Sequence, residues 1–184
     1  MEKNVTLIAL FAGLIAALGI IPAITLGFGV PITAQSLGVM LCGTILGSKR
    51  GGLAVLLFLL VVAIGVPLLS GGRGGLGVFA SPSAGFLIGW PVAAFVIGLI
   101  VEKWNGAPLV IVAGIASVVG GVIVMYAFGI VGMSIALDKT LLESTGLVTA
   151  FIPGDLLKAG IAGMLTAALA KARPASVLSR ADAV

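Results

Sequence analysis

Six long apolar runs, separated by short polar or glycine-rich connections, fill most of this 184-residue chain. Charged residues make up only 9% of it, whereas a soluble domain carries about 25%. Because about 20 apolar residues cross the core of a bilayer as a helix, the sequence predicts an all-α membrane protein with six transmembrane helices. The expected helices cover residues 5–26, 32–47, 52–69, 83–101, 108–132 and 153–171.

Lysine and arginine are distributed unevenly between the two sets of connections. Cytoplasmic connections of membrane proteins carry an excess of these residues. The side with both termini holds Lys3, Lys49, Arg50, Lys103, Lys171, Arg173 and Arg180. The opposite side holds Arg73 and Lys139. This distribution predicts that both termini are cytoplasmic.

The two ends of the chain complete the expected domain organisation. The first apolar run exceeds the roughly 7–15 residues of a signal-peptide core, so we expect it to remain as a membrane helix. Residues 174–184 follow the last basic cluster and have no apolar face. The sequence thus predicts one six-helix domain over residues 1–173 and a loose cytoplasmic tail over residues 174–184.

Charge and composition exclude several classes of function. The basic residues behind the net charge of +4 occur one or two at a time, which indicates topology signals beside a lipid bilayer and no nucleic acid partner. Histidine is absent and Cys42 is the single cysteine, so no His- or Cys-based metal site can form. We expect no metal, no cofactor and no enzymatic activity, because a hydrolase would also need an activated serine beside a base.

Asp155 and Lys158 stand out because a charge at the centre of a membrane helix costs about 2.5–3.5 kcal/mol on the insertion scale. They are three residues apart and share one helix face. Pro153 suits the first turn of a helix, where the helix dipole favours a carboxylate such as Asp155. Two interpretations remain open: an ion pair that only holds the helix end, or an acceptor and a cation that bind a polar solute at the extracellular side.

The glycine-rich sequence SGGRGG at residues 70–75 lies on the same side. Glycine allows close approach of the backbone to a ligand. The loop lacks the Gly-Lys-Ser/Thr ending of a nucleotide-binding loop, so ATP hydrolysis would have to come from another chain. Arg73 either meets lipid phosphates from a flexible connector or belongs to a re-entrant lid, since irregular backbone at membrane depth must line a cavity or be covered.

Other polar and aromatic residues allow two interpretations each. Gln35 follows Pro31 at the start of the second helix, where its amide would bond either a neighbouring helix or a ligand. Phe79, Phe86 and Trp90 follow the glycine-rich loop and either line an apolar pocket or anchor the chain at the membrane interface.

Ala12 and Ala16 are small residues four positions apart on one face of the first helix. Small side chains let helices pack closely in lipid. This face either packs inside the bundle or contacts another subunit, and the sequence leaves both open.

Four segments along the chain resemble the BioY family, the biotin-binding S components of energy-coupling-factor (ECF) transporters. They read VPITAQ at 30–35, GVPLLSGGRGG at 65–75, FASPSAGF at 79–86 and FIPGDLLK at 151–158. The segments occur in order across nearly the whole chain, so together they are far more specific than any one of them.

The resemblance implies the ECF S-component fold, with a biotin pocket that opens to the outside of a prokaryotic cell membrane. It implies that Asp155 and Lys158 hold polar groups of biotin, and that Arg73 stands where relatives carry Asn or Arg. Some relatives have an Arg directly after the position of Phe86, where this chain has Leu87, so Arg73 or Lys158 would meet the biotin carboxylate. The other implied substrate-binding residues are Gln35, Phe79, Ser83 and Phe86.

The partners implied by the resemblance are biotin and the transmembrane coupling subunit and ATPase subunits of an ECF module. The face with Ala12 and Ala16 is similar to the surface on which S components dock on the coupling subunit. The alternatives are a stand-alone biotin permease that works as a homo-oligomer, and an S component for another vitamin. Biotin uptake without coupling subunits would favour the first, and competition by another vitamin would favour the second.

Overall fold

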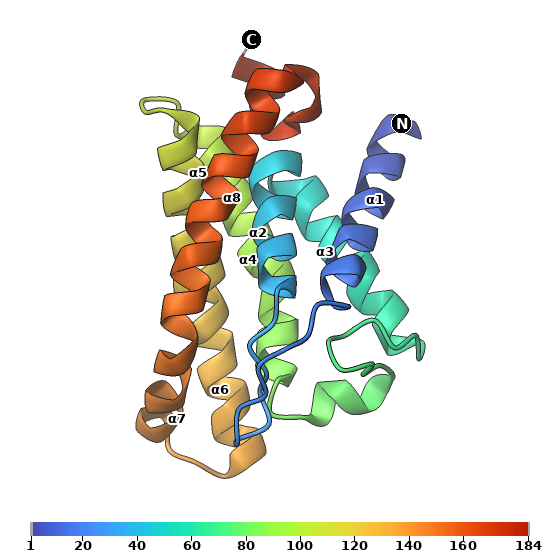
Figure 1. Cartoon of the computed structure of the whole chain (residues 1–184), viewed down its shortest axis with the longest axis vertical. Helices are drawn as coiled ribbons and strands as arrows, with labels where there is room; N and C mark the ends of the chain where they lie inside the picture. The colour runs from blue at the N-terminus through green and yellow to red at the C-terminus, as the bar shows by residue number, and fades with distance from the viewer. Residues whose placement is uncertain (1, 184) are drawn as a thin grey trace.

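The computed structural model describes residues 2–183, and over that range the chain is helical without β-strands (Figure 1). Three continuous helical segments of this range are long and apolar enough to cross a membrane. The first is α4 (Ala84–Lys103), and the second consists of α5 (Leu109–Val118), the π-helical η2 (Val119–Val124) and α6 (Met125–Leu137). The third consists of α7 (Leu141–Val148), η3 (Thr149–Phe151) and α8 (Ile152–Ala172). The predicted all-α multi-pass membrane architecture is confirmed.

Three shorter helices complete the bundle: α1 (Glu2–Leu18), α2 (Gln35–Leu46) and α3 (Ser48–Ala63). The central one is α2, which contacts α1, α3, α4 and α8 and is buried at every residue except Leu37. Its 12 residues span only about 18 Å, less than the ~30 Å core of a bilayer. The irregular chain before α2 must therefore reach into membrane depth, where it has to line a cavity or be covered by protein.

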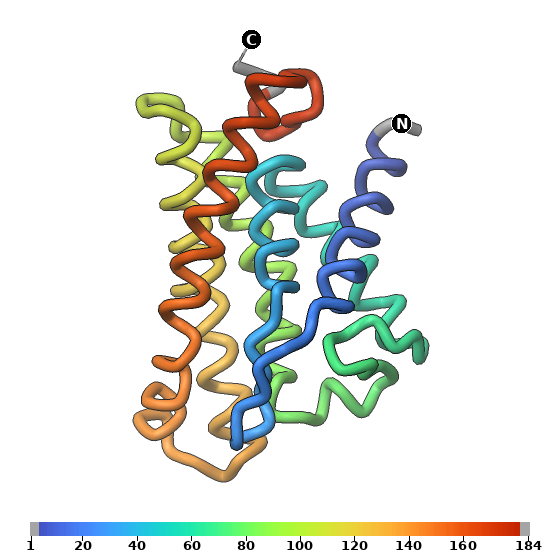
Figure 2. Tube along the Cα trace, viewed as in Figure 1, coloured from blue at the N-terminus to red at the C-terminus, as the bar shows by residue number. Residues whose placement is uncertain are grey.

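The connections gather at two opposite ends of the bundle. The terminal end holds the start of α1, the α2–α3 turn, the α4–α5 connection and the C-terminal segment with η4 (Pro174–Ser176) and η5 (Leu178–Ala183) (Figure 1). The loop end, at the bottom of Figure 2, holds residues 19–34, the glycine-rich loop with η1 (Leu76–Ala80), and the α6–α7 connection. The starts of α2, α4 and α8, distant in sequence, all point toward this loop end.

Two helices end earlier than the apolar runs that predict them. The first helix ends at Leu18 instead of residue 26, because Pro22 lacks an N–H donor and disfavours helical conformation in the residue before it. The third helix begins at Ser48 instead of 52 and ends at Ala63 instead of 69. Beyond Ala63, Gly65 has a φ of +110°, a conformation that side-chain-bearing residues rarely adopt.

The early start of α3 is explained by Glu102 of α4. The carboxylate of Glu102 accepts hydrogen bonds from the backbone N–H of Ser48 at 2.7 Å and from its hydroxyl at 2.8 Å. A negative charge stabilises a helix N-terminus in this way. The approach of the two helices also requires Gly98, because a Cβ at that position would collide with the backbone of Gly47 and Ser48.

The other predicted helices agree with the structure within a few residues. The second begins at Gln35 instead of 32, and the fifth continues to Leu137 instead of 132. The short helix α7 was not expected. It begins with a capping box, in which Thr140 Oγ1 accepts from the Glu143 N–H at 3.2 Å and Glu143 Oε2 accepts from the Thr140 N–H at 2.8 Å.

The expectation of a loose tail is wrong for the residues up to Arg180, whose side chains the structure describes. Val177 is buried, and Ser179 donates from its hydroxyl to the carbonyl of Thr44 in α2 at 2.5 Å. Arg180 donates to the carbonyl of Trp104 at 2.8 Å. The small and apolar residues of the tail fit against the terminal end of α2 and α4 although they form no continuous apolar face.

Candidate functional site

A cavity of about 60 Å³ lies near the loop end, between the starts of α2, α4 and α8 and the beginning of α6. Its polar lining residues are Thr33, Gln35, Ser36, Arg73, Ser83, Asp155 and Lys158. Its apolar lining residues are Val30, Pro31, Ile32, Leu69, Phe86, Leu87, Trp90, Met125 and Phe151. An apolar chamber with a few convergent polar groups is typical of sites for small molecules.

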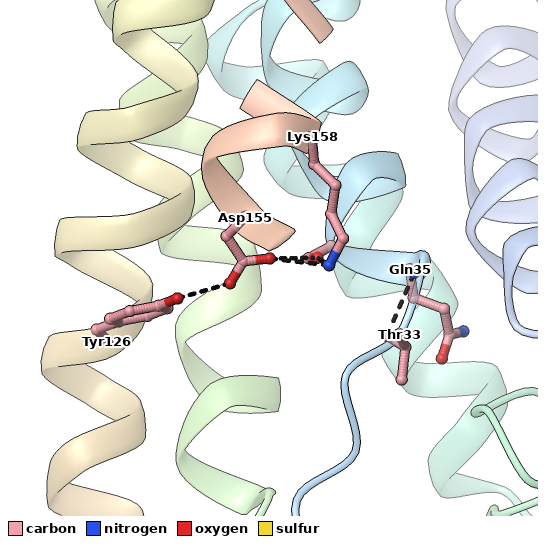
Figure 3. Close-up of polar contacts among 6 residues, drawn as sticks. Thr33, Gln35, Tyr126, Asp155 and Lys158 are labelled. Atoms are coloured by element: carbon pink, nitrogen blue, oxygen red, sulfur yellow. Dashed lines mark hydrogen bonds and ion pairs between the residues drawn. The ribbon is translucent and has the colours of Figure 1, made fainter. Parts of the chain in front are cut away.

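Asp155 is the centre of the polar network in this cavity (Figure 3). Its Oδ1 accepts from the ammonium of Lys158 at 2.9 Å and from the hydroxyl of Ser36 at 3.2 Å. Its Oδ2 accepts from the hydroxyl of Tyr126 at 2.8 Å. Lys158 also donates to Ser36 Oγ at 2.9 Å. Three helices, α2, α6 and α8, thus meet at one buried carboxylate.

The sequence around Asp155 explains its position. Pro153 and Asp155 both lie in the first turn of α8, directly after the 3₁₀ turn η3. Lys158, one turn further, lies on the same face and forms the ion pair. Both side chains are largely buried, with exposed fractions of 8% for Asp155 and 14% for Lys158. A buried pair costs desolvation, so stability alone does not account for it.

The side chain of Gln35 forms a structural clamp. Its side-chain amide donates to the carbonyls of Ile15 and Leu68, each at 3.1 Å, and its carbonyl accepts from the Ser70 N–H at 2.9 Å. These bonds tie the start of α2 to the end of α1 and to the beginning of the glycine-rich loop. Of the two interpretations of Gln35, the structure supports protein hydrogen bonding.

The glycine-rich loop turns back on itself and presents Arg73 to the cavity. Leu69 and Arg73 exchange backbone hydrogen bonds of 3.0 and 3.2 Å, and the two glycines between Ser70 and Arg73 have φ of +79° and +70°. The guanidinium of Arg73 donates to the Ser70 carbonyl at 3.3 Å and to Ser83 Oγ at 3.2 Å. Partial burial lowers the pKa of Arg73, but a guanidinium stays protonated at neutral pH.

The charges of the cavity do not cancel. Among the residues that the structure describes, the only ion pair is that of Lys158 and Asp155. Arg73 is therefore a half-buried cation without a carboxylate beside it. The chamber carries one excess positive charge and suits a ligand with one negative group and further polar groups.

Aromatic rings form much of the apolar wall. Phe151 makes edge-to-face contacts with Phe28 and Phe86, at centroid distances of 6.0 and 5.7 Å. Trp90 contacts Phe58 of α3 in a tilted arrangement, with 6.1 Å between the ring centroids. Large, rigid rings of this kind can bury the apolar body of a ligand at little cost in conformational entropy.

Six of the seven predicted substrate-binding residues lie around this one cavity. They are Gln35, Arg73, Ser83, Phe86, Asp155 and Lys158. Phe79 does not join them, because the 3₁₀ helix η1 directs it to a separate apolar groove between α4 and α6. Of the predicted docking pair, Ala12 is buried within the bundle and Ala16 is half-buried at the loop end of α1.

Two residues of the polar network were not predicted. Ser36 follows Gln35 directly, and Tyr126 is the only tyrosine in the chain. A hydroxyl costs little inside an apolar helix, so neither residue stands out as Asp155 does. The position of Tyr126 within a wholly apolar run was the one available signal, since a buried tyrosine hydroxyl needs a partner.

Comparisons with known proteins agree on one family. A model of the BioY family matches residues 2–175. The chain is 54% identical to the biotin transporter BioY of Rhodobacter capsulatus over 98% of this chain and 100% of the relative. It is 49% identical to the biotin transporter BioY of Rhizobium etli, over 89% of this chain and 90% of the relative.

The same relationship holds for a solved structure. The fold matches the crystal structure of the S-component for biotin from an ECF-type ABC transporter with a TM-score of 0.87. The two chains are 35% identical, and the match covers 92% of each. With this likeness in fold, the close relatives and the family match over nearly the whole length, the chain belongs to the BioY family.

Proposed function

We propose that this chain captures biotin from outside the cell and serves as the substrate-binding S component of an ECF-type transporter. The observation that carries the proposal is the cavity in which the buried Asp155–Lys158 pair and the unpaired Arg73 meet inside an aromatic wall. Biotin has two ureido N–H donors, a ureido carbonyl, an apolar bicyclic body and one carboxylate. Each group has a complementary partner in this chamber.

The polar groups of the chain divide naturally between the two ends of the ligand. Asp155 accepts from a ureido N–H, and Lys158 donates to the ureido carbonyl, while the pair itself remains neutral. Arg73 meets the carboxylate, because it is the cation of this cavity that no carboxylate of the described residues pairs with. Leu87, where some relatives carry an Arg, is buried in the cavity wall and supplies no alternative cation.

The cavity must widen to admit biotin. Its volume of about 60 Å³ holds a few water molecules, whereas sites for small molecules measure about 300–1,000 Å³. The helical walls are fixed by close packing, but Val30–Thr33 and Leu69–Arg73 belong to irregular segments. We infer that these two segments separate when the ligand enters.

Energy for transport comes from partner subunits in this proposal. Ala12 faces the inside of the bundle, so we place the surface that docks on the coupling subunit on the outer face of α1. There Ala9, Gly13 and Ala17 are exposed and four residues apart, next to the half-buried Ala16. Small residues at this spacing let a foreign helix approach closely. We place the terminal end, with its excess of lysine and arginine, on the cytoplasmic side of the cell membrane.

Equilibrium binding of radiolabelled biotin to the purified chain in detergent tests the capture role. We expect saturation near one biotin per chain, without competition from excess thiamine or riboflavin. A folded chain that binds no biotin, or that releases it to one of these vitamins, would contradict the proposed substrate.

Reconstituted vesicles test the energy source. Biotin should accumulate only when the coupling and ATPase subunits are present together with ATP. Accumulation by the chain alone would instead support a stand-alone permease.

A further inference from the structure

Tyr126 contacts the candidate site from behind its wall. Its hydroxyl donates to Asp155 Oδ2 at 2.8 Å, yet Tyr126 is not among the residues that line the cavity. The ring is buried and packs edge-to-face on Phe86 at 6.3 Å and on Phe151 at 6.4 Å. In the cavity as it stands, Tyr126 reaches a ligand through Asp155 and the aromatic wall.

The position of Tyr126 depends on the π-helical turn η2 directly before it. A π-helix closes its hydrogen bonds over one additional residue, which turns the following helix face by about 100° relative to an uninterrupted α-helix. Glycines let this wide turn fit between its neighbours. A Cβ on Gly120 would lie 2.7 Å from the Ala93 carbonyl, and a Cβ on Gly121 would lie 2.5 Å from Met40 Cε.

The hydrogen bond from Tyr126 restricts a torsion that is otherwise soft. The terminal torsion of an aspartate side chain has broad energy wells, so a carboxylate held at one oxygen can rotate. Lys158 and Ser36 both bind Oδ1, and Tyr126 is the partner of Oδ2. With both oxygens held from opposite sides, the plane of the carboxylate is fixed before a ligand arrives, which lowers the cost of binding.

We propose that Tyr126, placed by the π-helical turn η2, is a positioning residue that orients the Asp155 carboxylate toward the N–H groups of the ligand. The inference rests on the proposed function, because it takes biotin as the ligand that Asp155 meets. It adds a determinant of specificity outside the cavity lining, on a helix that contributes only Met125 to that lining.

The first test compares Tyr126→Phe with Thr166→Val. Tyr126→Phe keeps the ring contacts and removes only the hydroxyl, so we expect the Kd for biotin to rise about tenfold. Thr166→Val removes another buried hydroxyl bond, of 2.8 Å to Thr44, about 16 Å along α8 from Asp155. It should leave the Kd unchanged. Wild-type affinity in Tyr126→Phe, or an equal loss in both variants, would overturn the inference.

The second test reports on the surroundings of the Tyr126 hydroxyl, because the fluorine of 3-fluorotyrosine lies on the adjacent ring carbon. Because the chain contains one tyrosine, incorporation of 3-fluorotyrosine gives a single ¹⁹F resonance. Saturating biotin should shift this resonance, with a midpoint at the Kd measured by binding. A resonance that does not move while biotin binds would overturn the positioning role alone. Absence of biotin binding by the folded wild-type chain would instead contradict the proposed function.

Discussion

Replacement of Asp155 by Asn removes the charge at the centre of the network and keeps the size of the side chain. Asp155 accepts three hydrogen bonds, from Lys158, Ser36 and Tyr126, and it neutralises the ammonium of Lys158. The amide can accept on one atom only, so at least one of these donors loses its partner. Lys158, exposed by only 14%, is left as a nearly buried cation.

The magnitude follows from these contacts. A hydrogen bond to a charged group contributes about 1.5–3 kcal/mol, and each 1.4 kcal/mol corresponds to a factor of ten in affinity. If Asp155 makes one such bond to a ureido N–H, Asp155→Asn should raise the Kd for biotin about 10- to 100-fold. The unpaired Lys158 should also lower the apparent melting temperature in detergent, by several degrees.

The assay is equilibrium binding of labelled biotin, with melting of the same samples to show that they are folded. Lys171→Gln is the matched control, because it removes an exposed charge from the same helix about 24 Å away from Asp155. It should bind as the wild type does. A folded Asp155→Asn variant with wild-type affinity would show that Asp155 does not bind the ligand.

Three further predictions follow from the loop and the packing. Arg73→Gln should raise the Kd for biotin about tenfold and leave that for biotin amide unchanged; an equal loss for both would place the carboxylate elsewhere. Gln35→Leu leaves the Ser70 N–H without its acceptor, so it should lower the melting temperature and speed the dissociation of biotin. An unchanged dissociation rate would argue against the clamp. Gly98→Ala should destabilise the chain by about 1–3 kcal/mol in thermal melts. Gly13→Ala, which has open space for its Cβ, should not, and equal melting of the two variants would contradict the packing of α3 on α4.

Hydropathy predicted the spanning helices well but not the limits of two of them. It counts apolar side chains, and residues 19–26 are apolar although Pro22 and the glycines around it do not support a helix. The chain between Leu18 and Gln35 instead runs as an irregular strap that supplies part of the cavity wall. Among its residues only Val30 is buried, while Ile20 and Ile24 are exposed by 83% and 65%, so apolar character alone does not distinguish this strap from a membrane helix.

The residues of the candidate site were likewise predictable from the sequence only in part. Asp155 and Lys158 were found because an intramembrane charge is costly and must have a partner or a purpose. Ser36 and Tyr126 carry no such cost, and only the three-dimensional meeting of α2, α6 and α8 places them on the carboxylate. Phe79 was placed in the site by sequence proximity to the loop, but the orientation of η1 turns it toward a different groove.

A crystal structure of the chain with biotin bound would show which residues hold each end of the ligand. We expect a widened cavity in which the ureido ring lies on Asp155 and Lys158 and the carboxylate lies on Arg73. Biotin bound in the apolar groove beside Phe79, or with its carboxylate on Lys158 and no contact to Arg73, would contradict it.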